Sequence, residues 1–514
     1  MKDKITITDP IVGIDLGTTR SVVAHVDFMG DVKTVPNREG ELTTASAVLF
    51  DDGSVTVGKE ALKALAVMPS QVAMYAKREM GSPTFSKKIN GQSYPPEMIQ
   101  SFVLAKLRRD AEQKLGCEIS KVVITVPAYF NEPKRRATMD AGLLAGLDVR
   151  AVINEPTAAA IAFGVDRISR IVGEQTTLVF DLGGGTLDVS IVKVDGKKIQ
   201  TIATDGNAML GGIDWDKCLA RWLDAQFSVQ HSIKPSESEL GQEFLRREAE
   251  ELKHSLSSRS KVNIRLTYQG KILKTEIKRD EFEEMTAHLL DRCRFTVRKV
   301  VIDSRLEWIE IDRILLVGGS TRMPMIPEML QKESGIEPDA SVSADEVVAH
   351  GAAIYASTLL ESTDTGGQLD FPEITDVNAH HLGVLGVDKK TGRRIGHVMI
   401  PRNTPLPASK VTRFETIRDR QPSVAVEVIE GGNSTGLNAT SIGRCVIDNL
   451  PKNLPGGTPV DVAFRYDTDG LIHIEAIMPT TGQRTEMTID RVGGLTNDDK
   501  DKLTNILEEL GLDD

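Results

Sequence analysis

Two glycine-rich segments of the same design lie far apart in the chain, DLGTT at residues 15–19 and DLGGGT at residues 181–186. Each follows an apolar run, at residues 11–14 and 178–180, and each precedes an alternating run, at residues 21–28 and 187–194, so each copy predicts a hairpin. Glycine lets the backbone approach phosphate oxygens closely, threonine adds donors, and aspartate can hold a hydrated cation. One such loop is usually only a turn, but two copies predict a nucleotide held from two sides.

Length, charge and cysteine spacing limit the class of protein. A chain of 514 residues exceeds what one core usually supports, so we expect two or three domains. The net charge of −12 argues against a nucleic-acid partner, which would need clustered Lys and Arg. The four scattered cysteines predict reduced thiols. Residues 1–10 are charged and no apolar run is long enough to span a membrane, so we expect a cytoplasmic protein without membrane contact.

The hydrophobic pattern divides the chain into an α/β part and a strand-rich part. Residues 1–360 alternate apolar strands with amphipathic helices, such as residues 97–115, which Gly116 ends. Residues 361–377 (ESTDTGGQLDFPEITDV) predict a linker, residues 378–495 a β-sandwich, and residues 496–514 one short helix. The strands expected in the sandwich lie at residues 394–400, 411–417, 424–430, 444–450, 460–466, 471–478 and 484–489.

Four strings, VITVPAYF, NEPTAAA, DLGGGT and VGGSTRMP, make the chain resemble the DnaK-type family of 70-kilodalton heat-shock chaperones from about residue 11 to about residue 495. The resemblance implies an actin-like (ribonuclease H-like, duplicated) α/β ATPase domain followed by a β-sandwich that binds peptide. Family members continue into a helical lid over the peptide. Because this chain ends before such a lid could form, we expect a lidless chaperone that retains clients loosely.

The resemblance also assigns roles around the phosphates. It implies Lys77 facing the γ-phosphate and the attacking water, Glu155 behind Mg²⁺, and K⁺ held by Asp15 and Asp188. From the residues alone, Lys77 beside an arginine would be a solvated surface pair, and Glu155 a helix N-terminal charge. The phosphate-binding residues expected in the two loops are Gly17, Thr18, Thr19, Gly183, Gly184, Gly185 and Thr186. The catalytic residues expected are Lys77, Glu155, Asp181 and Thr186, and Mg²⁺ is expected near Asp15 and Asp181, mostly through waters.

Contacts with the ATP or ADP nucleoside are expected from two further segments. Glu250, Lys253 and Ser257 recur at helical i, i+3, i+7 spacing and match the family's ribose and adenine contacts, although that spacing would equally suit an exposed helix face. The other adenine-site residues that the resemblance implies are Gly318, Gly319, Ser320, Arg322 and Asp345.

The peptide-binding groove is predicted from the resemblance as well. Val384, Phe414, Val424, Val426 and Leu471 match the family's pocket, and the alternative for each is ordinary sandwich core.

Three departures predict altered coupling between the two domains. Pro372 interrupts the linker and should impair strand-like docking, Arg150 lies one position early so that Ala151 takes the family's basic position, and the loop at residues 387–393 is long and charged.

Two other classes of protein share nucleotide folds of this kind, namely small-metabolite kinases and actin-like filament or scaffold ATPases. A kinase would need a catalytic aspartate near a substrate pocket, and a filament would sediment in an ATP-dependent way. We favour an ATPase that switches the affinity of its second domain for apolar peptide segments. A J-domain co-chaperone and a nucleotide exchange factor are partners that the resemblance implies.

Overall fold

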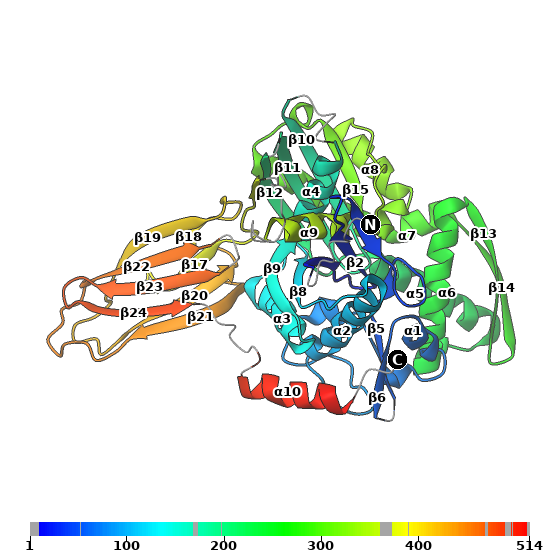
Figure 1. Cartoon of the computed structure of the whole chain (residues 1–514), viewed down its shortest axis with the longest axis horizontal. Coiled ribbons are helices and arrows are strands. Elements are labelled where there is room, and N and C mark those ends of the chain that lie inside the picture. The colour runs from blue at the N-terminus through cyan, green and yellow to red at the C-terminus, as the bar shows by residue number, and fades with distance from the viewer. Residues whose placement is uncertain are drawn as a thin grey trace, which may run out of the picture.

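The computed structural model describes residues 10–51, 53–167, 173–196, 198–359, 373–388, 390–467, 471–488, 495 and 497–510. We call residues 10–359 the α/β region and residues 376–488 the β-sandwich. Figure 1 shows the β-sandwich projecting from one side of the α/β region, with the last helix, α10 (Asn497–Glu509), lying against the α/β region.

The α/β region contains two sheets built on the same plan. In the first, β1 pairs antiparallel with β2 and parallel with β8; in the second, β10 pairs antiparallel with β11 and parallel with β15. This repeat confirms the duplicated actin-like fold and both predicted hairpins. The strands of the first sheet are β1 (Val12–Asp15), β2 (Arg20–Val26), β3 (Val32–Val35), β4 (Thr44–Ala45), β8 (Lys121–Val126) and β9 (Asp148–Asn154). Those of the second are β10 (Gln175–Leu182), β11 (Leu187–Asp195), β12 (Lys198–Asn207), β15 (Arg313–Val317) and β16 (Glu373–Thr375).

Helices and two small sheets complete the α/β region. The helices are α1 (Lys59–Ala64), α2 (Pro96–Leu115), α3 (Glu132–Leu144), α4 (Glu155–Arg167), α5 (Gly212–His231), α6 (Glu239–Ser258), α7 (Arg279–Ser304), α8 (Met325–Ser334) and α9 (Val347–Thr358). The 3-10 turns are η1 (Pro69–Gln71), η2 (Ala76–Glu79), η3 (Pro235–Glu237), η4 (Trp308–Glu310) and η5 (Gly319–Arg322). One small sheet contains β5 (Ala47–Asp51), β6 (Ser54–Val57) and β7 (Val72–Met74). The other contains β13 (Lys261–Tyr268) and β14 (Lys271–Lys278). The predicted helix at residues 97–115 is α2, and Gly116 ends it with φ +70°.

The α/β region has two halves, the first built on the first sheet and the second on the second sheet. Small residues let α9 pack closely between them. A Cβ on Gly351 would lie 1.7 Å from the carbonyl oxygen of Ala158 in α4, and one on Gly13 would lie 2.1 Å from the backbone nitrogen of Ala353. Ala158 and Ala353 are fully buried. The alanines of the NEPTAAA string therefore serve the packing of α4 on α9.

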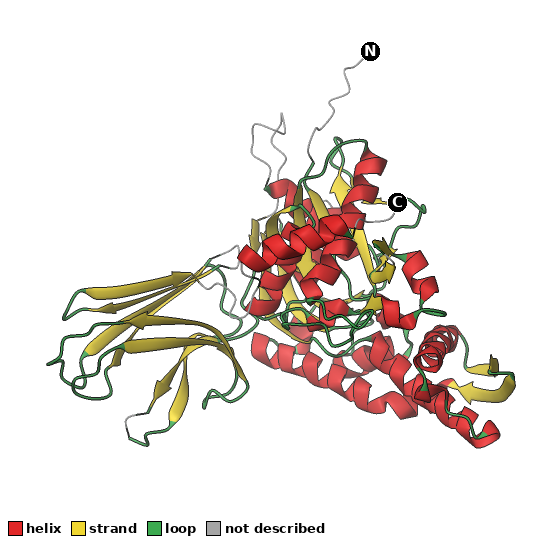
Figure 2. Ribbon diagram, turned by 90° about the horizontal axis from the view of Figure 1, so that it is seen from below, coloured by secondary structure: helices red, strands yellow, loops and turns green. Residues whose placement is uncertain are grey.

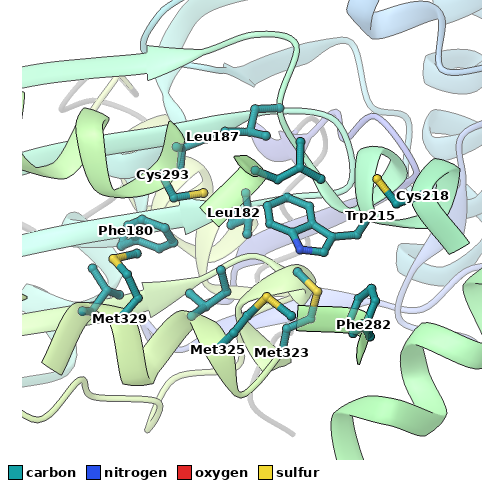
Figure 3. Close-up of a cluster of buried hydrophobic side chains, with 14 of the residues drawn as sticks. Phe180, Leu182, Leu187, Trp215, Cys218, Phe282, Cys293, Met323, Met325 and Met329 are labelled. Carbon is teal, nitrogen blue, oxygen red and sulfur yellow. The ribbon is translucent and has the colours of Figure 1, made fainter. Parts of the chain in front are cut away.

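The core of the second half is large and rich in methionine. Trp215 of α5 is fully buried and lies among side chains from the second sheet and from α8, including Leu182 and Met325 (Figure 3). Burial of aromatic and methionine side chains stabilises the region by about 1.5–3 kcal/mol each. This core fixes the sheet end from which the DLGGGT loop projects.

The β-sandwich consists of two four-stranded antiparallel sheets, which form two layers in Figure 2. The first contains β17 (Leu382–Val387), β18 (Arg394–Ile400), β20 (Val424–Gly431) and β21 (Ala439–Ile447); the second contains β19 (Ala408–Glu415), β22 (Pro459–Tyr466), β23 (Ile472–Met478) and β24 (Gln483–Thr488). Alternating residues such as Val428, Phe464 and Ile474 are buried between the layers. The predicted sandwich is confirmed.

The segment after Pro372 docks as a strand, so the expectation of impaired docking is wrong for these residues. β16 extends the second sheet by parallel pairing with β12, with Ile374 opposite Ile199. Proline lacks an N–H, but the strand begins at Glu373, and the edge pairing needs only the groups after the proline. Residues 360–372, which carry most of the predicted linker, lie outside the described residues.

The last helix makes a second connection to the α/β region. Lys500 of α10 pairs with Asp140 of α3 at 2.8 Å, and Leu503 is 9% exposed in the core of the first half. The β-sandwich is thus attached through β16 before its first strand and through α10 after its last.

Candidate nucleotide site and interdomain contacts

A cavity of about 1190 Å³ opens between the two halves of the α/β region, and most predicted nucleotide residues line it. They come from the two loops, from η2, from the start of α4, from α6 and from the turn after β15. The predicted residues that line it are Asp15, Gly17, Thr18, Thr19, Lys77, Glu155, Asp181, Gly183, Gly184, Thr186, Glu250, Lys253, Ser257, Gly318, Gly319, Ser320, Arg322 and Asp345. Gly185, in the DLGGGT turn, and Asp188, on β11, are not among the residues that line it.

The two glycine loops face each other across this cavity. A Cβ on Gly184 would lie 2.5 Å from Cγ2 of Thr19, and one on Gly185 would lie 2.4 Å from Oγ1 of Thr18. Only glycine fits at these two positions, because larger residues would push the loops apart. The loops are therefore close enough to contact one chain of phosphates together.

Lys77 and Glu155 form a buried ion pair on the floor of the site. The Nζ of Lys77 lies 2.5 Å from Oε1 of Glu155, and the two side chains are 3% and 9% exposed. The surface-pair alternative for Lys77 is therefore wrong. η2 supplies the lysine, and Glu155 is the first residue of α4, where a carboxylate is favoured by the helix dipole.

Three buried aspartates surround that pair. Burial, and then repulsion by Glu155, raises the pKa of Asp15 to about 6 and that of Asp188 to about 8, and raises the pKa of Asp181 as well. A bound cation would offset this crowding of negative charge, so the donor set fits a Mg²⁺ or K⁺ ion. Among the described residues no three His, Cys, Asp or Glu side chains are arranged to hold a metal directly.

The nucleoside end of the cavity is organised by partners that the sequence pattern did not reveal. Lys253 pairs with Asp216 of α5 at 2.8 Å, and both side chains are buried. Arg322 pairs with Asp345 at 2.7 Å, and the hydroxyl of Ser320 donates to the carbonyl of Gly183 at 2.9 Å. The last contact joins the turn after β15 to the DLGGGT loop.

Asp376, which follows β16, binds the α/β region beside Glu155. Its Oδ2 accepts hydrogen bonds from Nδ2 of Asn154 at 2.8 Å and from Oγ1 of Thr157 at 3.0 Å. Asn154 and Thr157 flank the glutamate of the Lys77 pair in the chain. Glu155, which holds Lys77, is therefore one residue from Asn154 and two from Thr157, the residues that bind Asp376 of the β-sandwich.

The β-sandwich makes further polar contacts with β12 and with the segment before α3. Arg402 donates to the carbonyl of Thr204 and pairs with Asp205, both at 3.0 Å, and it pairs with Asp303 at 2.9 Å. The Nε2 of His380 lies 3.0 Å from the carbonyl oxygen of Tyr129, so that nitrogen is the donor.

Comparison with known sequences agrees with this arrangement. A profile of the family described as Hsp70 protein matches residues 11–90 and 81–514. The chain is 38% identical over 501 residues to "Chaperone protein DnaK" of Thermosipho melanesiensis, covering 96% of this chain and 82% of that protein. It is 37% identical over 508 residues to "Chaperone protein DnaK" of Mycoplasma mobile, covering 98% of this chain and 82% of that protein.

The chain belongs to the Hsp70 family. The family assigned from the sequence is thus confirmed, and neither a metabolite kinase nor a filament ATPase is favoured by these relatives. Within the described part of this Hsp70 chain, no helix has the length and apolar character needed to cross a membrane.

Arg150 and Ala151, where this Hsp70 chain departs from the expected family pattern, lie at an irregularity of β9. Val122 pairs with Val149 and Val123 pairs with Ala151, so Arg150 is an extra residue in a β-bulge of β9. Its side chain pairs with Asp148 at the surface, at 3.2 Å. Buried Ala151 takes the ladder position beside this bulge.

Four of the five predicted peptide-binding residues of the Hsp70 sandwich belong to, or pack against, one hydrophobic cluster of the β-sandwich. Val384 and Val426 are 4% and 6% exposed within the sandwich core. Val424 is half-buried, and Phe414 is half-buried with its ring 5.2 Å from that of His397. Leu471 lines a cavity between the β-sandwich and the α/β region.

Tyr75 and Arg246 are cavity residues that sequence reasoning missed. Tyr75 has φ +65°, an uncommon left-handed conformation for tyrosine, and burial raises the pKa of its phenol to about 12. Nη1 of Arg246 lies 3.5 Å from the phenol oxygen, and Arg246 also pairs with Glu243 at 2.6 Å and Glu250 at 2.9 Å. This contact crosses the cleft from η2 to α6, and no signal in one sequence links residues so far apart.

Proposed function

We propose that this Hsp70 chain is an ATP-driven chaperone of the DnaK type, in which ATP hydrolysis changes the affinity of the β-sandwich for exposed apolar peptide segments. The observation that carries the proposal is the junction of β9 and α4. There Asn154 and Thr157 bind Asp376 of the β-sandwich, while Glu155 between them holds Lys77 at the nucleotide site. The assignment also agrees with relatives named as DnaK chaperones over most of the chain.

Hydrolysis at this site would proceed by attack of water on the γ-phosphorus as the bond to the ADP oxygen breaks, giving ADP and phosphate. The ammonium of Lys77 would donate to the γ-phosphate and orient the water, and Glu155 would hold that ammonium in place. The loop glycines and Thr18, Thr19 and Thr186 would bind the phosphates through backbone and hydroxyl donors.

Mg²⁺ would neutralise phosphate charge when bound, held mostly through waters near Asp15 and Asp181. K⁺ would lie near Asp15 and Asp188. The crowding of buried carboxyl groups around Lys77 supports cation binding at these positions.

The adenosine would lie between α6 and the turn after β15, which places Glu250, Lys253 and Ser257 opposite Arg322. The ion pairs of Lys253 with Asp216 and of Arg322 with Asp345 would keep both walls in position.

The remaining partners are proposed from family membership. Unfolded polypeptide segments would be the clients, and a J-domain co-chaperone and a nucleotide exchange factor would regulate the cycle. The negative net charge and the wide spacing of the four cysteines in the sequence support a cytoplasmic location without nucleic-acid partners.

The test is the fluorescence anisotropy of a labelled apolar heptapeptide with the full chain, measured first with ADP and then with ATP. We expect faster peptide release with ATP, and we expect Asp376→Ala to bind peptide but to lose most of that acceleration. Asp461→Ala is the matched control, because Asp461 pairs with Arg413 at 2.7 Å on the exposed surface of the β-sandwich. Peptide binding that ignores the nucleotide would refute the proposal.

A further inference from the structure

Two buried glutamates meet where the β-sandwich rests on the start of α3. Glu132, the first residue of α3, is 6% exposed, and Glu430, near the end of β20, is 7% exposed. The backbone N–H of Glu132 donates to Oε2 of Glu430 at 2.8 Å. Both side chains line one cavity of about 100 Å³ between the two parts of the molecule. Two carboxyl groups thus share one enclosed site at the interface.

Two arginines of the α/β region and Asp376 of the β-sandwich line the same cavity as the two glutamates. Arg135 donates to the carbonyl of Phe130 at 3.2 Å and to Asn154, so these hydrogen bonds are directed away from both glutamates. Arg136 lies on the same helix and lines the same cavity. Asp376 lines it too and accepts its hydrogen bonds from Asn154 and Thr157.

Tyr466 and His380 are the titratable groups that face the cavity from the sandwich side. Burial raises the pKa of Tyr466, so its phenol is neutral at physiological pH. Burial lowers the pKa of His380 to about 4, so its ring is neutral as well. Neither residue supplies a positive charge to the two glutamates in the docked arrangement.

We propose that Glu132 and Glu430 share at least one proton when the β-sandwich is docked, and that docking therefore takes up a proton. Two ionised carboxylates enclosed together repel each other, and burial penalises each charge. Separation of the two parts would return both side chains to water, where they ionise freely. The inference rests on the proposed cycle only in requiring that the β-sandwich can leave the α/β region.

The direction of the pKa shifts supports this geometry. Burial raises the pKa of Glu132 to about 7, against the lowering effect of Arg135 and Arg136. Burial, together with repulsion by Glu132, raises the pKa of Glu430 to about 8. Because the docked pKa values lie above the ordinary value of 4.5, this contribution to docking is full below about pH 4.5, falls as pH rises, and is lost above about pH 8.

His380 has the opposite effect, but in a different pH range. Its docked pKa lies below the ordinary 6.5, so its contribution favours docking above that pH and is lost as pH falls toward about 4. Between pH 7 and pH 8 the histidine is neutral when docked and mostly neutral when separated, so it changes docking by only about 1.3-fold, in the opposite direction. In that window the glutamates alone make docking weaker as pH rises.

The test measures the docked fraction by energy transfer in the full chain at saturating ATP, between pH 7 and pH 8. Dyes are attached at Lys410→Cys on the β-sandwich and Lys234→Cys on the α/β region, both exposed positions, with Cys117→Ser to prevent side labelling. Because each proton taken up changes an equilibrium constant about tenfold per pH unit, we expect docking to weaken roughly tenfold over this range.

Glu430→Gln keeps an acceptor for the N–H of Glu132 but removes the ionisable group, and it should reduce the change to less than roughly threefold. Glu132→Gln should also reduce it, and the double variant should abolish it. Glu427→Gln is the matched control on the same strand, because Glu427 pairs with Arg394 at the surface at 2.8 Å, and it should behave as the wild type. A wild-type docking constant that stays constant from pH 7 to pH 8, or a Glu430→Gln variant with the full tenfold change, would overturn the inference. Energy transfer that never responds to nucleotide would instead refute the proposed cycle.

Discussion

Removal of the Lys77 ammonium tests the catalytic site most directly. In Lys77→Met the ion pair with Glu155 is lost, and a carboxylate remains buried beside three aspartates. Breaking such a pair by removing one partner costs about 3–5 kcal/mol of stability, less whatever the glutamate recovers by taking up a proton. Loss of one preorganised donor to the reacting phosphate lowers kcat about 10²–10³-fold, equivalent to about 2.7–4 kcal/mol.

Single-turnover hydrolysis with protein in excess over ATP measures the chemical step, and thermal unfolding measures stability separately. Adding Glu155→Gln to Lys77→Met should restore stability, because no uncompensated charge remains, but should leave hydrolysis slow. Lys63→Met is the matched control, because Lys63 lines the same cavity with its side chain 61% exposed and pairs with Glu60 of its own helix. Its hydrolysis should stay within about twofold of wild type. If Lys77→Met hydrolyses ATP within threefold of the wild-type rate, the role assigned to this lysine is wrong.

Three further variants test the packing and the mouth of the cleft. Gly351→Ala would place a Cβ 1.7 Å from the carbonyl oxygen of Ala158. It should therefore lower the unfolding free energy of the α/β region by at least about 1–3 kcal/mol. An unchanged denaturation midpoint would contradict the packing of α9 on α4. Trp215→Ala should cost about 3–5 kcal/mol by leaving a cavity, and denaturant unfolding that shows less than 1 kcal/mol would contradict full burial. Tyr75→Phe removes the hydrogen bond from Arg246 of α6, which is worth about 0.5–1.5 kcal/mol. ADP should therefore dissociate roughly two- to tenfold faster in a stopped-flow displacement assay. An unchanged rate would exclude a role of Tyr75 in nucleotide retention.

Local patterns predicted much of the fold. Each DLG loop follows an apolar strand and leads into another, which is why both hairpins could be assigned from the sequence. The strand predicted at residues 394–400 is β18, whereas β19 begins three residues before the predicted strand at residues 411–417. β17 (Leu382–Val387) was not predicted, because its sequence LGVLGV lacks the alternation of polar and apolar residues that marks a half-exposed strand.

The site was less predictable, because its decisive contacts join distant segments. Lys77 and Glu155 are 78 positions apart, and only resemblance to a family selected them from the chain's charged residues. Nothing near Asp216 marks it as the partner of Lys253, and no local pattern marks Arg150 as the extra residue of a β-bulge. These are tertiary effects, which hydrophobic periodicity does not encode.

The two attachments of the β-sandwich limit how it can move. β16 ties its beginning to the second sheet, while α10 ties its end to the first half through Lys500 and a few apolar side chains. A module held at both ends cannot swing freely about one hinge, and after one attachment opens, the other keeps the freed end at a high effective concentration near its site. Separation is then a sequence of two steps, and the first is readily reversed. Release of α10 alone would let the sandwich pivot about β16 without losing its place in the second sheet.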